Sequence, residues 1–305
     1  MKKYFIYSTL FLTMSFVSNA QQLPLYSQYM FNGFLLNPGI AGSVDYFPIR
    51  LTARQQWVGI KDAPSTQAIS AHYLMEAQKL GLGGFIFNDK FGPLSETGIQ
   101  LSGSYHLPLE GINSKLGLGL AFKAFQFKFD ETNLVTIDEN DMAVTHGKIT
   151  KFVPDADFGA YLYNDKYYVG ISATQLIQFK IDLGDSNTVD KNKIIRHYYS
   201  LAGYRFSLND DFELEPSLLF KGTMQTPWQI DINAKAIYKS MYWLGLSYRS
   251  SKDLVAMLGV KVKKFYIGYA FDYTFTSIKN YSNGSHEILI GFNVFEGKNK
   301  GSSLL

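Results

Sequence analysis

Two runs near the C-terminal end of the chain alternate between apolar residues and residues of other kinds. In Lys264–Tyr273 every second position from Phe265 onward is aromatic or aliphatic. In His286–Val294 the even-numbered positions from Ile288 onward are apolar in the same way. Successive side chains of a β-strand point to opposite faces. Both runs are therefore predicted to be strands with one apolar face and one face that is small, polar or charged.

Runs with this period follow one another along most of the chain, about fourteen in all from Ile49 onward. In Trp228–Tyr238, for example, Gln229, Asp231 and Lys235 share one face, and apolar side chains share the other. Alternation alone does not separate a membrane barrel from a soluble sandwich, because a sandwich sheet also has one wet face. The predicted strands are Ile49–Trp57, Gln67–Leu74, Gly81–Phe87, Gly98–Leu107, Leu116–Phe129, Asp155–Tyr163, Tyr167–Thr174, Tyr198–Leu208, Phe212–Lys221, Trp228–Tyr238, Tyr242–Tyr248, Leu254–Val262, Lys264–Tyr273 and His286–Val294.

The lengths of the connections favour a barrel. Short connections follow the even-numbered strands, as at 164–166 and 209–211, and most of those after odd-numbered strands are longer, notably 130–150 and 175–197. A barrel inserted from the periplasm has short turns inside and longer loops outside. The sequence therefore predicts an all-β fold, a transmembrane antiparallel outer-membrane β-barrel of about 14 strands over residues 49–295.

Residues 1–20 have the features of a secretory signal peptide. Lys2 and Lys3 precede an apolar stretch, and Ser18-Asn19-Ala20 supplies small residues for cleavage near Ala20-Gln21. The apolar stretch is too short to be read as a membrane helix. We therefore expect export and localisation to the outer membrane, with a polar tail at residues 296–305.

Composition agrees with a wall that faces lipid. Aromatic residues make up 16% of the chain and charged residues 18%, whereas a soluble domain carries about a quarter charged residues. The absence of cysteine excludes disulfides, thiol catalysis, cysteine metal sites and a lipid anchor on an N-terminal cysteine. Without the two signal-peptide lysines the formal charge falls from +3 to +1, which gives no support for nucleic-acid binding.

Residues 21–48 are rich in aromatic rings but lack a regular period, and Pro and Gly residues break them into turns. We expect this stretch to pack into or under the barrel as a plug-like segment. The alternative is an ordinary N-terminal strand followed by a linker. The candidate plug residues are Tyr26, Tyr29, Phe31, Asn37 and Pro38.

Charged residues fall mainly on the faces that are not apolar, and Arg50 and Lys221 are among them. One interpretation is a network of paired charges that fills and stiffens the lumen, since unpaired charges in a confined space are costly. The other is a polar lining that binds a plug or a partner. The acidic loops at 130–150 and 182–190 are either solvated or an outward docking surface that binds divalent cations weakly. The candidate lumen or partner-facing residues are Arg54, Lys123, Asp231, Lys235, Arg249, Asp272 and Glu287.

Motifs for catalysis or cofactor binding are missing. The five histidines show no metal-ligand spacing, and there is no Gly-rich phosphate loop. Ser285-His286-Glu287 contains the residue types of a triad, but consecutive strand residues point to alternate faces. The glycines at 81–84 and 117–119 lie on predicted strands, where they allow curvature or close packing. We expect no enzyme activity, no cofactor and no metal.

A set of short stretches runs in order across nearly the whole mature chain. They are Tyr26-Ser-Gln-Tyr-Met-Phe-Asn, Asn37-Pro-Gly-Ile-Ala-Gly-Ser, Arg54-Gln-Gln-Trp-Val-Gly, Ala63-Pro-Ser-Thr, Asn88-Asp-Lys-Phe-Gly-Pro, Gly203-Tyr-Arg-Phe, Pro216-Ser-Leu-Leu, Leu244-Gly-Leu-Ser-Tyr-Arg, Ile267-Gly-Tyr-Ala-Phe-Asp-Tyr and Gly284-Ser-His-Glu-Ile. Together they resemble the PorP/SprF family of type IX secretion membrane proteins from Bacteroidota. The chain departs from the family pattern at Gly39 and Ile40, where Ala and an aromatic residue are expected after Asn-Pro.

The resemblance implies an outer-membrane barrel that works with other components of type IX secretion. Members of the family are associated with particular secreted proteins that carry a C-terminal sorting domain, often large surface adhesins, and some serve gliding motility. The resulting hypothesis is a non-enzymatic protein that binds and anchors one such adhesin. One alternative is a plugged transporter or channel for small or hydrophobic solutes, by analogy of fold alone. A third alternative is an outer-membrane lipase or acyltransferase.

Overall fold

The computed structural model describes residues 25–132, 147–181 and 193–294. The predicted signal peptide, most of the two acidic loops and the predicted polar tail lie outside the described residues. The strands are β1 (Pro48–Gln55), β2 (Ser65–Met75), β3 (Leu80–Phe91), β4 (Leu94–Leu109), β5 (Ser114–Asp130), β6 (Lys148–Tyr163), β7 (Tyr167–Thr174), β8 (His197–Tyr204), β9 (Phe206–Ser207), β10 (Phe212–Gly222), β11 (Gln229–Tyr238), β12 (Tyr242–Arg249), β13 (Asp253–Val262), β14 (Phe265–Thr274) and β15 (Ser285–Asn293). Short 3₁₀ helices are η1 (Tyr29–Phe31), η2 (Gly33–Leu35), η3 (Pro38–Ile40), η4 (Glu76–Gln78), η5 (Glu110–Ile112) and η6 (Ser277–Asn280).

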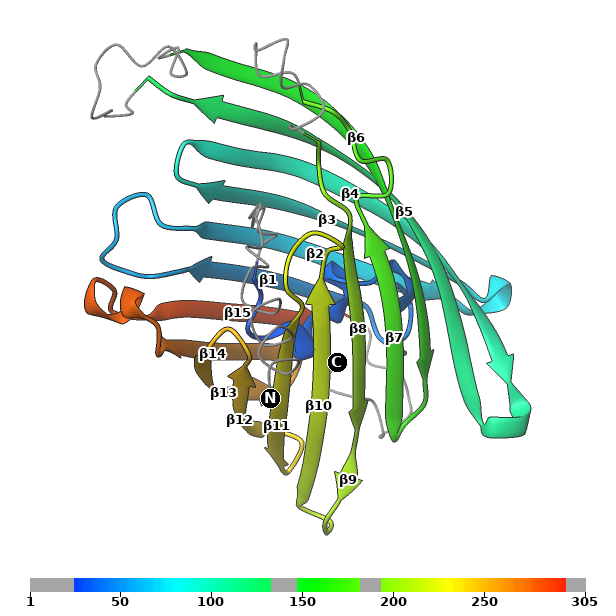
Figure 1. Cartoon of the computed structure of the whole chain (residues 1–305). Coiled ribbons are helices and arrows are strands. Elements are labelled where there is room, and N and C mark those ends of the chain that lie inside the picture. The colour runs from blue at the N-terminus through cyan, green and yellow to red at the C-terminus, as the bar shows by residue number, and fades with distance from the viewer. Residues whose placement is uncertain (1–24, 133–146, 182–192, 295–305) are drawn as a thin grey trace, which may run out of the picture.

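The strands form one closed antiparallel barrel (Figure 1). Neighbours in sequence are neighbours in the wall, β1 pairs with β15, and β10 pairs with β11. The two-residue β9 continues β8 after a break at Arg205 and pairs with β10, so β8 and β9 occupy one position in the wall. Over the described ranges the barrel therefore has the fourteen strands that the sequence predicts.

The period-two pattern divides each strand between lipid and interior. In β12, Leu244 and Leu246 are 65% and 59% exposed, whereas Trp243 before them and Arg249 after them are 2% exposed. The same alternation runs through β14 and β15. An outward apolar band with a polar interior is the pattern of an outer-membrane barrel. Within the described part of the chain, no helix has the length and hydropathy of a membrane span.

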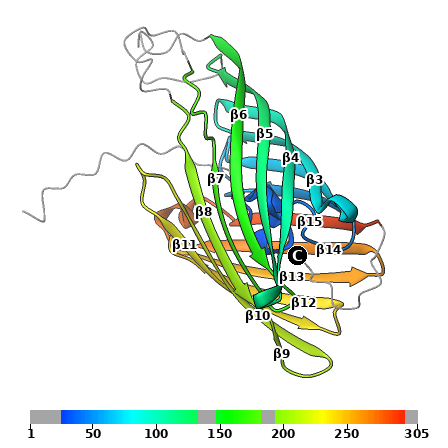
Figure 2. The same ribbon diagram turned by 90° about the vertical axis from the view of Figure 1, so that its right-hand side faces the viewer.

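The wall is taller on one side. β4, β5 and β6 contain 16, 17 and 16 residues, while β1 and β12 contain 8 each. A strand needs about 9–11 residues to span a bilayer. Figure 1 and Figure 2 show β5 and β6 rising past the other strands at one end.

These extensions correct the predicted strand bounds. The sequence predicts a ten-residue connection at 88–97, but β3 and β4 continue to a two-residue turn at Gly92 and Pro93, and β6 begins seven residues before its predicted start. Polar residues occupy both faces there, at Asn88, Asp89 and Lys90 for example. A strand that leaves the bilayer is wetted on both faces, so it loses the alternation that a sequence pattern detects.

The two ends of the barrel differ. The connections after β2, β4, β6, β9, β11 and β13 are short and define the turn end, where the chain also enters β1 and leaves β15. The other connections define the loop end and include the long segments at 131–147 and 175–196. Residues 25–46, here called the N-terminal segment, run inside the barrel (Figure 1, blue). Most of their side chains are buried, including Tyr29, Phe31 and Phe34.

Candidate functional site in the barrel interior

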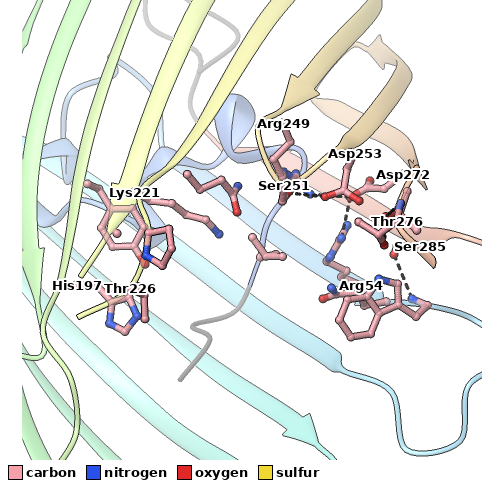
Figure 3. Close-up of a pocket in the computed structure, with 18 residues that line it drawn as sticks. Arg54, His197, Lys221, Thr226, Arg249, Ser251, Asp253, Asp272, Thr276 and Ser285 are labelled. Atoms are coloured by element: carbon pink, nitrogen blue, oxygen red, sulfur yellow. Dashed lines mark hydrogen bonds and ion pairs between the residues drawn. The ribbon is translucent and has the colours of Figure 1, made fainter. Parts of the chain in front are cut away.

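An ion network crosses the loop-end half of the lumen. The Asp272 carboxylate on β14 pairs with Arg54 Nη2 at 2.7 Å and with Arg249 Nη1 at 3.0 Å. Arg249 Nε also pairs with Asp231 at 3.1 Å. The four residues come from β1, β11, β12 and β14, and each is at most 3% exposed. Buried charges of this kind are tolerated because every member has an opposite charge and hydrogen bonds (Figure 3).

The N-terminal segment is part of this network. The Ser27 and Gln28 amides donate to the two carboxylate oxygens of Glu287 on β15, at 2.6 Å and 2.9 Å. The Ser27 hydroxyl donates to Asp272 at 2.8 Å and accepts from Arg54 Nη1 at 2.8 Å. Arg54 lies 3.6 Å from Glu287 as well. Arg249 Nη2 also donates to the Ser27 hydroxyl at 3.2 Å, so the segment is hydrogen-bonded to charged side chains from four strands of the wall.

Strand register places the partners side by side. Asp231 on β11 lies opposite Arg249 on β12, and Arg54 on β1 lies opposite Glu287 on β15. Opposite charges on one face of an antiparallel pair attract each other directly. The inward faces therefore bring these charges together once the barrel closes.

A second network lies nearer the turn end. Glu215 on β10 pairs with Lys235 Nζ at 3.0 Å and with Arg205 Nη2 at 2.8 Å. The Lys235 ammonium also lies 4.6 Å from the centre of the Phe31 ring, a cation–π contact with the N-terminal segment. The Asn233 side-chain amide donates to the Tyr29 hydroxyl. A separate pair, Lys123 Nζ to Asp157 at 2.9 Å, joins β5 to β6.

Glycines in the wall allow η3 to lie against the strands. The Asn37 side chain donates to the carbonyl oxygens of Ala160 at 3.0 Å and Ile171 at 3.2 Å, and accepts from the Gly39 amide at 2.8 Å. A Cβ at Gly119 would collide with the backbone of Pro38 and Gly39, and one at Gly159 would collide with the Asn37 side chain. The close packing here is one of the two roles that the sequence predicts for strand glycines.

The seven candidate lumen residues all have side chains inside the barrel. The loop-end network contains five of them, Lys235 belongs to the second network, and Lys123 pairs separately. The five candidate plug residues also lie inside the barrel, with Tyr26 half-buried and the others buried. That the lumen residues face a partner, and that the N-terminal segment acts as a plug, remain predictions.

Other candidates are dispersed. Ser285 and Glu287 face inward, while the His286 ring between them bonds to the Tyr269 hydroxyl on the outer side of β15. No group of His, Cys, Asp and Glu side chains suited to a metal ion is present in the described part of the chain. Most of the acidic loop residues lie outside the described residues. Asp130, at the edge of one loop, pairs with Lys148 at 3.1 Å.

Sequence reasoning missed the partners of the predicted charges. Ser27 and Gln28 bind Glu287 through backbone amides, which no residue pattern reveals. Arg205 lies at the break between β8 and β9, where alternation fails. Two of these partners could have been predicted from the inward faces of neighbouring strands. Glu215 lies directly opposite Lys235, and Asp157 lies two residues from the position opposite Lys123.

A cavity of about 330 Å³ opens above the loop-end network, and we call it the vestibule (Figure 3). Its walls are the loop-end parts of strands from both sides of the barrel, and Leu25 of the N-terminal segment contributes to its lining. The charged residues that line it are Arg54, Lys221, Arg249, Asp253 and Asp272. The arrangement offers hydrogen-bond donors and charges to a polar ligand.

Comparisons with known proteins agree with a membrane barrel of a secretion system. The model of one protein family, described as type IX secretion system membrane protein PorP/SprF, matches residues 18–292. None of the curated proteins matches the chain.

Solved structures with a similar chain course are outer-membrane proteins at low identity. The outer membrane protein Omp33 of Acinetobacter baumannii has 7% identity and a TM-score of 0.49, over 82% of this chain and 98% of that one. A FadL homologue of Pseudomonas aeruginosa has 10% identity and a TM-score of 0.45, over 90% and 95% of the two chains. A KdgM porin has 10% identity and a TM-score of 0.40, over 82% and 99%.

Proposed function

Because the chain belongs to the PorP/SprF family of type IX secretion system membrane proteins, we propose that it holds one secreted surface protein at the cell surface by binding that protein's C-terminal sorting domain. The protein is an outer-membrane β-barrel and a membrane component of type IX secretion. Its role in the proposal is binding rather than catalysis. The bound protein would be an adhesin, of the kind that serves gliding in some members of the family.

The observation that carries the proposal is the occupied lumen. The N-terminal segment is hydrogen-bonded to Glu287 and Asp272, and it packs against Lys235 and the glycines of β5 and β6. A lumen that holds its own chain through hydrogen bonds to buried charged groups is suited to a fixed support. Each hydrogen bond to a charged group contributes about 1.5–3 kcal/mol, which opposes repeated opening.

The loop end offers the surface on which a partner would bind. The vestibule opens there, and β4, β5 and β6 rise past the rest of the rim (Figure 2). In an outer-membrane barrel the end with the longer loops faces the exterior. A secreted domain would therefore meet a polar cavity beside a tall wall.

The test of the proposal is recovery of the partner. Cells expressing the tagged full-length barrel are crosslinked while intact, and the barrel is purified in detergent. The proposal expects one large surface protein, attached through its C-terminal sorting domain. Recovery of no surface protein, or of many unrelated ones in equal amount, would overturn it.

A plugged transporter is the other function to exclude, and the occupied lumen does not favour it. Reconstitution into planar bilayers distinguishes the two. A support with a filled lumen gives no steady conductance, whereas a transporter gives discrete channels or solute uptake.

A further inference from the structure

Lys221 differs from the other cations of the barrel interior. Its side chain leaves the inward face of β10, is half-buried, and reaches into the vestibule (Figure 3). The described residues give its ammonium no ion pair, hydrogen bond or aromatic ring. Five other interior cations each have a carboxylate oxygen at 2.7 to 3.1 Å; they are Arg54, Lys123, Arg205, Lys235 and Arg249.

The carboxylates around the vestibule already have partners. Asp272 is shared by the two arginines of the loop-end network. Asp231 pairs with Arg249 and accepts a 2.6 Å hydrogen bond from the Gln229 amide. Asp253 accepts a 2.6 Å hydrogen bond from the Ser251 hydroxyl and lies on the opposite side of the vestibule from Lys221 (Figure 3). The Lys221 ammonium therefore relies on solvent in the cavity.

The size of the cavity limits what can bind there. Its volume of about 330 Å³ is at the small end of the range for ligand pockets, about 300–1,000 Å³. That space accommodates a side chain or a chain terminus, and a folded domain would remain outside. Lipid headgroups are separated from the vestibule by the barrel wall.

We propose that the vestibule binds a carboxylate carried by a polypeptide, either an acidic side chain or a C-terminus, and that Lys221 is its counterion. The polypeptide part of this assignment rests on the proposed function, because the secreted partner is the chain expected at the loop end. An ammonium–carboxylate hydrogen bond in a confined polar cavity is stronger than one between neutral groups. The bound carboxylate would supply the negative counter-charge that the Lys221 ammonium lacks.

The first experiment tests the carboxylate site without a partner. The full-length barrel in detergent is titrated with N-acetyl-glutamic acid α-amide at constant ionic strength, and tryptophan fluorescence reports binding because Trp57 lines the vestibule. The glutamine counterpart of this probe differs only in its neutral side chain. Saturation with the acidic probe and none with the neutral one supports the proposal. Equal responses to both, or no response to either, would overturn it.

Two substitutions locate the site. Lys221→Met is expected to weaken binding of the acidic probe about tenfold or more, and Lys221→Arg should retain it. The matched control is Lys279→Met, which removes the same charge from an exposed position of η6 at the loop end that does not line the vestibule. The migration of unheated protein in gels shows that each variant is folded. A Lys221→Met barrel that binds the acidic probe as well as the wild type would overturn the proposal.

The source of the carboxylate is decided in cells. If a polypeptide supplies it, Lys221→Met lowers recovery of the crosslinked surface protein while Lys279→Met leaves recovery unchanged. Equal recovery from both, with probe binding lost in Lys221→Met, would overturn the polypeptide assignment in favour of a free carboxylate. If the wild type recovers no partner, the proposed function fails, and the titration still judges the carboxylate site independently.

Discussion

The Ser27 amide donates a 2.6 Å hydrogen bond to the carboxylate of Glu287, 260 residues later in the chain. The Glu287 side chain is fully buried and also accepts from the Gln28 amide. This carboxylate joins the start of the described chain to the last strand of the barrel. Closure of the wall and the position of the N-terminal segment are therefore linked through one side chain.

Glu287→Gln should loosen the N-terminal segment while the barrel still forms. The substitution replaces one acceptor oxygen by a donor and removes the charge that holds two amides and lies near Arg54. Hydrogen bonds to charged groups contribute about 1.5–3 kcal/mol, so amide exchange in residues 25–31 should accelerate about tenfold to hundredfold. Exchange measured by mass spectrometry checks this. Glu110→Gln, at an exposed position of η5, is the control and should leave the rate unchanged.

Gly119→Ala should destabilise the contact between η3 and the wall. A Cβ at this position collides with the backbone of Pro38 and Gly39, which cannot turn aside as a flexible side chain can. Overpacking of this kind costs about 1–3 kcal/mol. The temperature at which folded barrel converts to the unfolded form in a gel should fall. Gly103→Ala on β4, where a Cβ would meet nothing within 4 Å, should have no such effect, and an equal loss in both variants would refute the role of η3.

Lys235→Met alone should lower the free energy of unfolding more than the double variant that removes the charges of both Lys235 and Glu215. It leaves the buried Glu215 with Arg205 alone and removes the cation from the Phe31 ring. Breaking one side of a buried pair costs about 3–5 kcal/mol, and the double variant with Glu215→Gln should recover part of this. Urea unfolding of the barrel in liposomes measures the four free energies of the cycle. If the free-energy losses of the two single variants add up to that of the double variant, Lys235 and Glu215 are not coupled and the prediction is wrong.

Leu244→Arg should impair insertion into the membrane. Leu244 is 65% exposed within β12, on the face that contacts lipid, where an arginine costs up to about 2–4 kcal/mol at the bilayer midplane. Phe152 on β6 is just as exposed, at 69%, but lies in the part of the wall that extends past the other strands. Phe152→Arg should therefore insert normally. Similar yields of membrane-inserted barrel from both variants would refute this placement of the bilayer.

Much of the fold was predictable because lipid and lumen impose a strict alternation. The predicted bounds of β7, Tyr167–Thr174, are those of the structure, since a short polar turn precedes an alternating run and the alternation stops where the long loop begins. The failures lie where that constraint ends. Strands β3, β4 and β6 continue past the bilayer with polar residues on both faces, so their extensions resemble loops in the sequence.

The interior was predictable in part for the same reason. The alternation along each strand placed Arg54, Asp272 and Glu287 on the face opposite the apolar one, and these three residues are buried in the lumen. Their partners were not predictable, because the contact of Glu287 with Ser27 depends on the path of an irregular segment through the closed barrel. Neither the isolation of Lys221 nor the vestibule follows from the sequence, since both depend on which opposing side chains meet.

Retention of the secreted partner on the cell surface tests the central claim most directly. The gene for the barrel is deleted in the native host, and the adhesin with the sorting domain is quantified on intact cells and in the medium. The account predicts that surface adhesin is lost and that it returns when the wild-type barrel is restored. Adhesin that reaches the surface and stays there in undiminished amount without the barrel would contradict it.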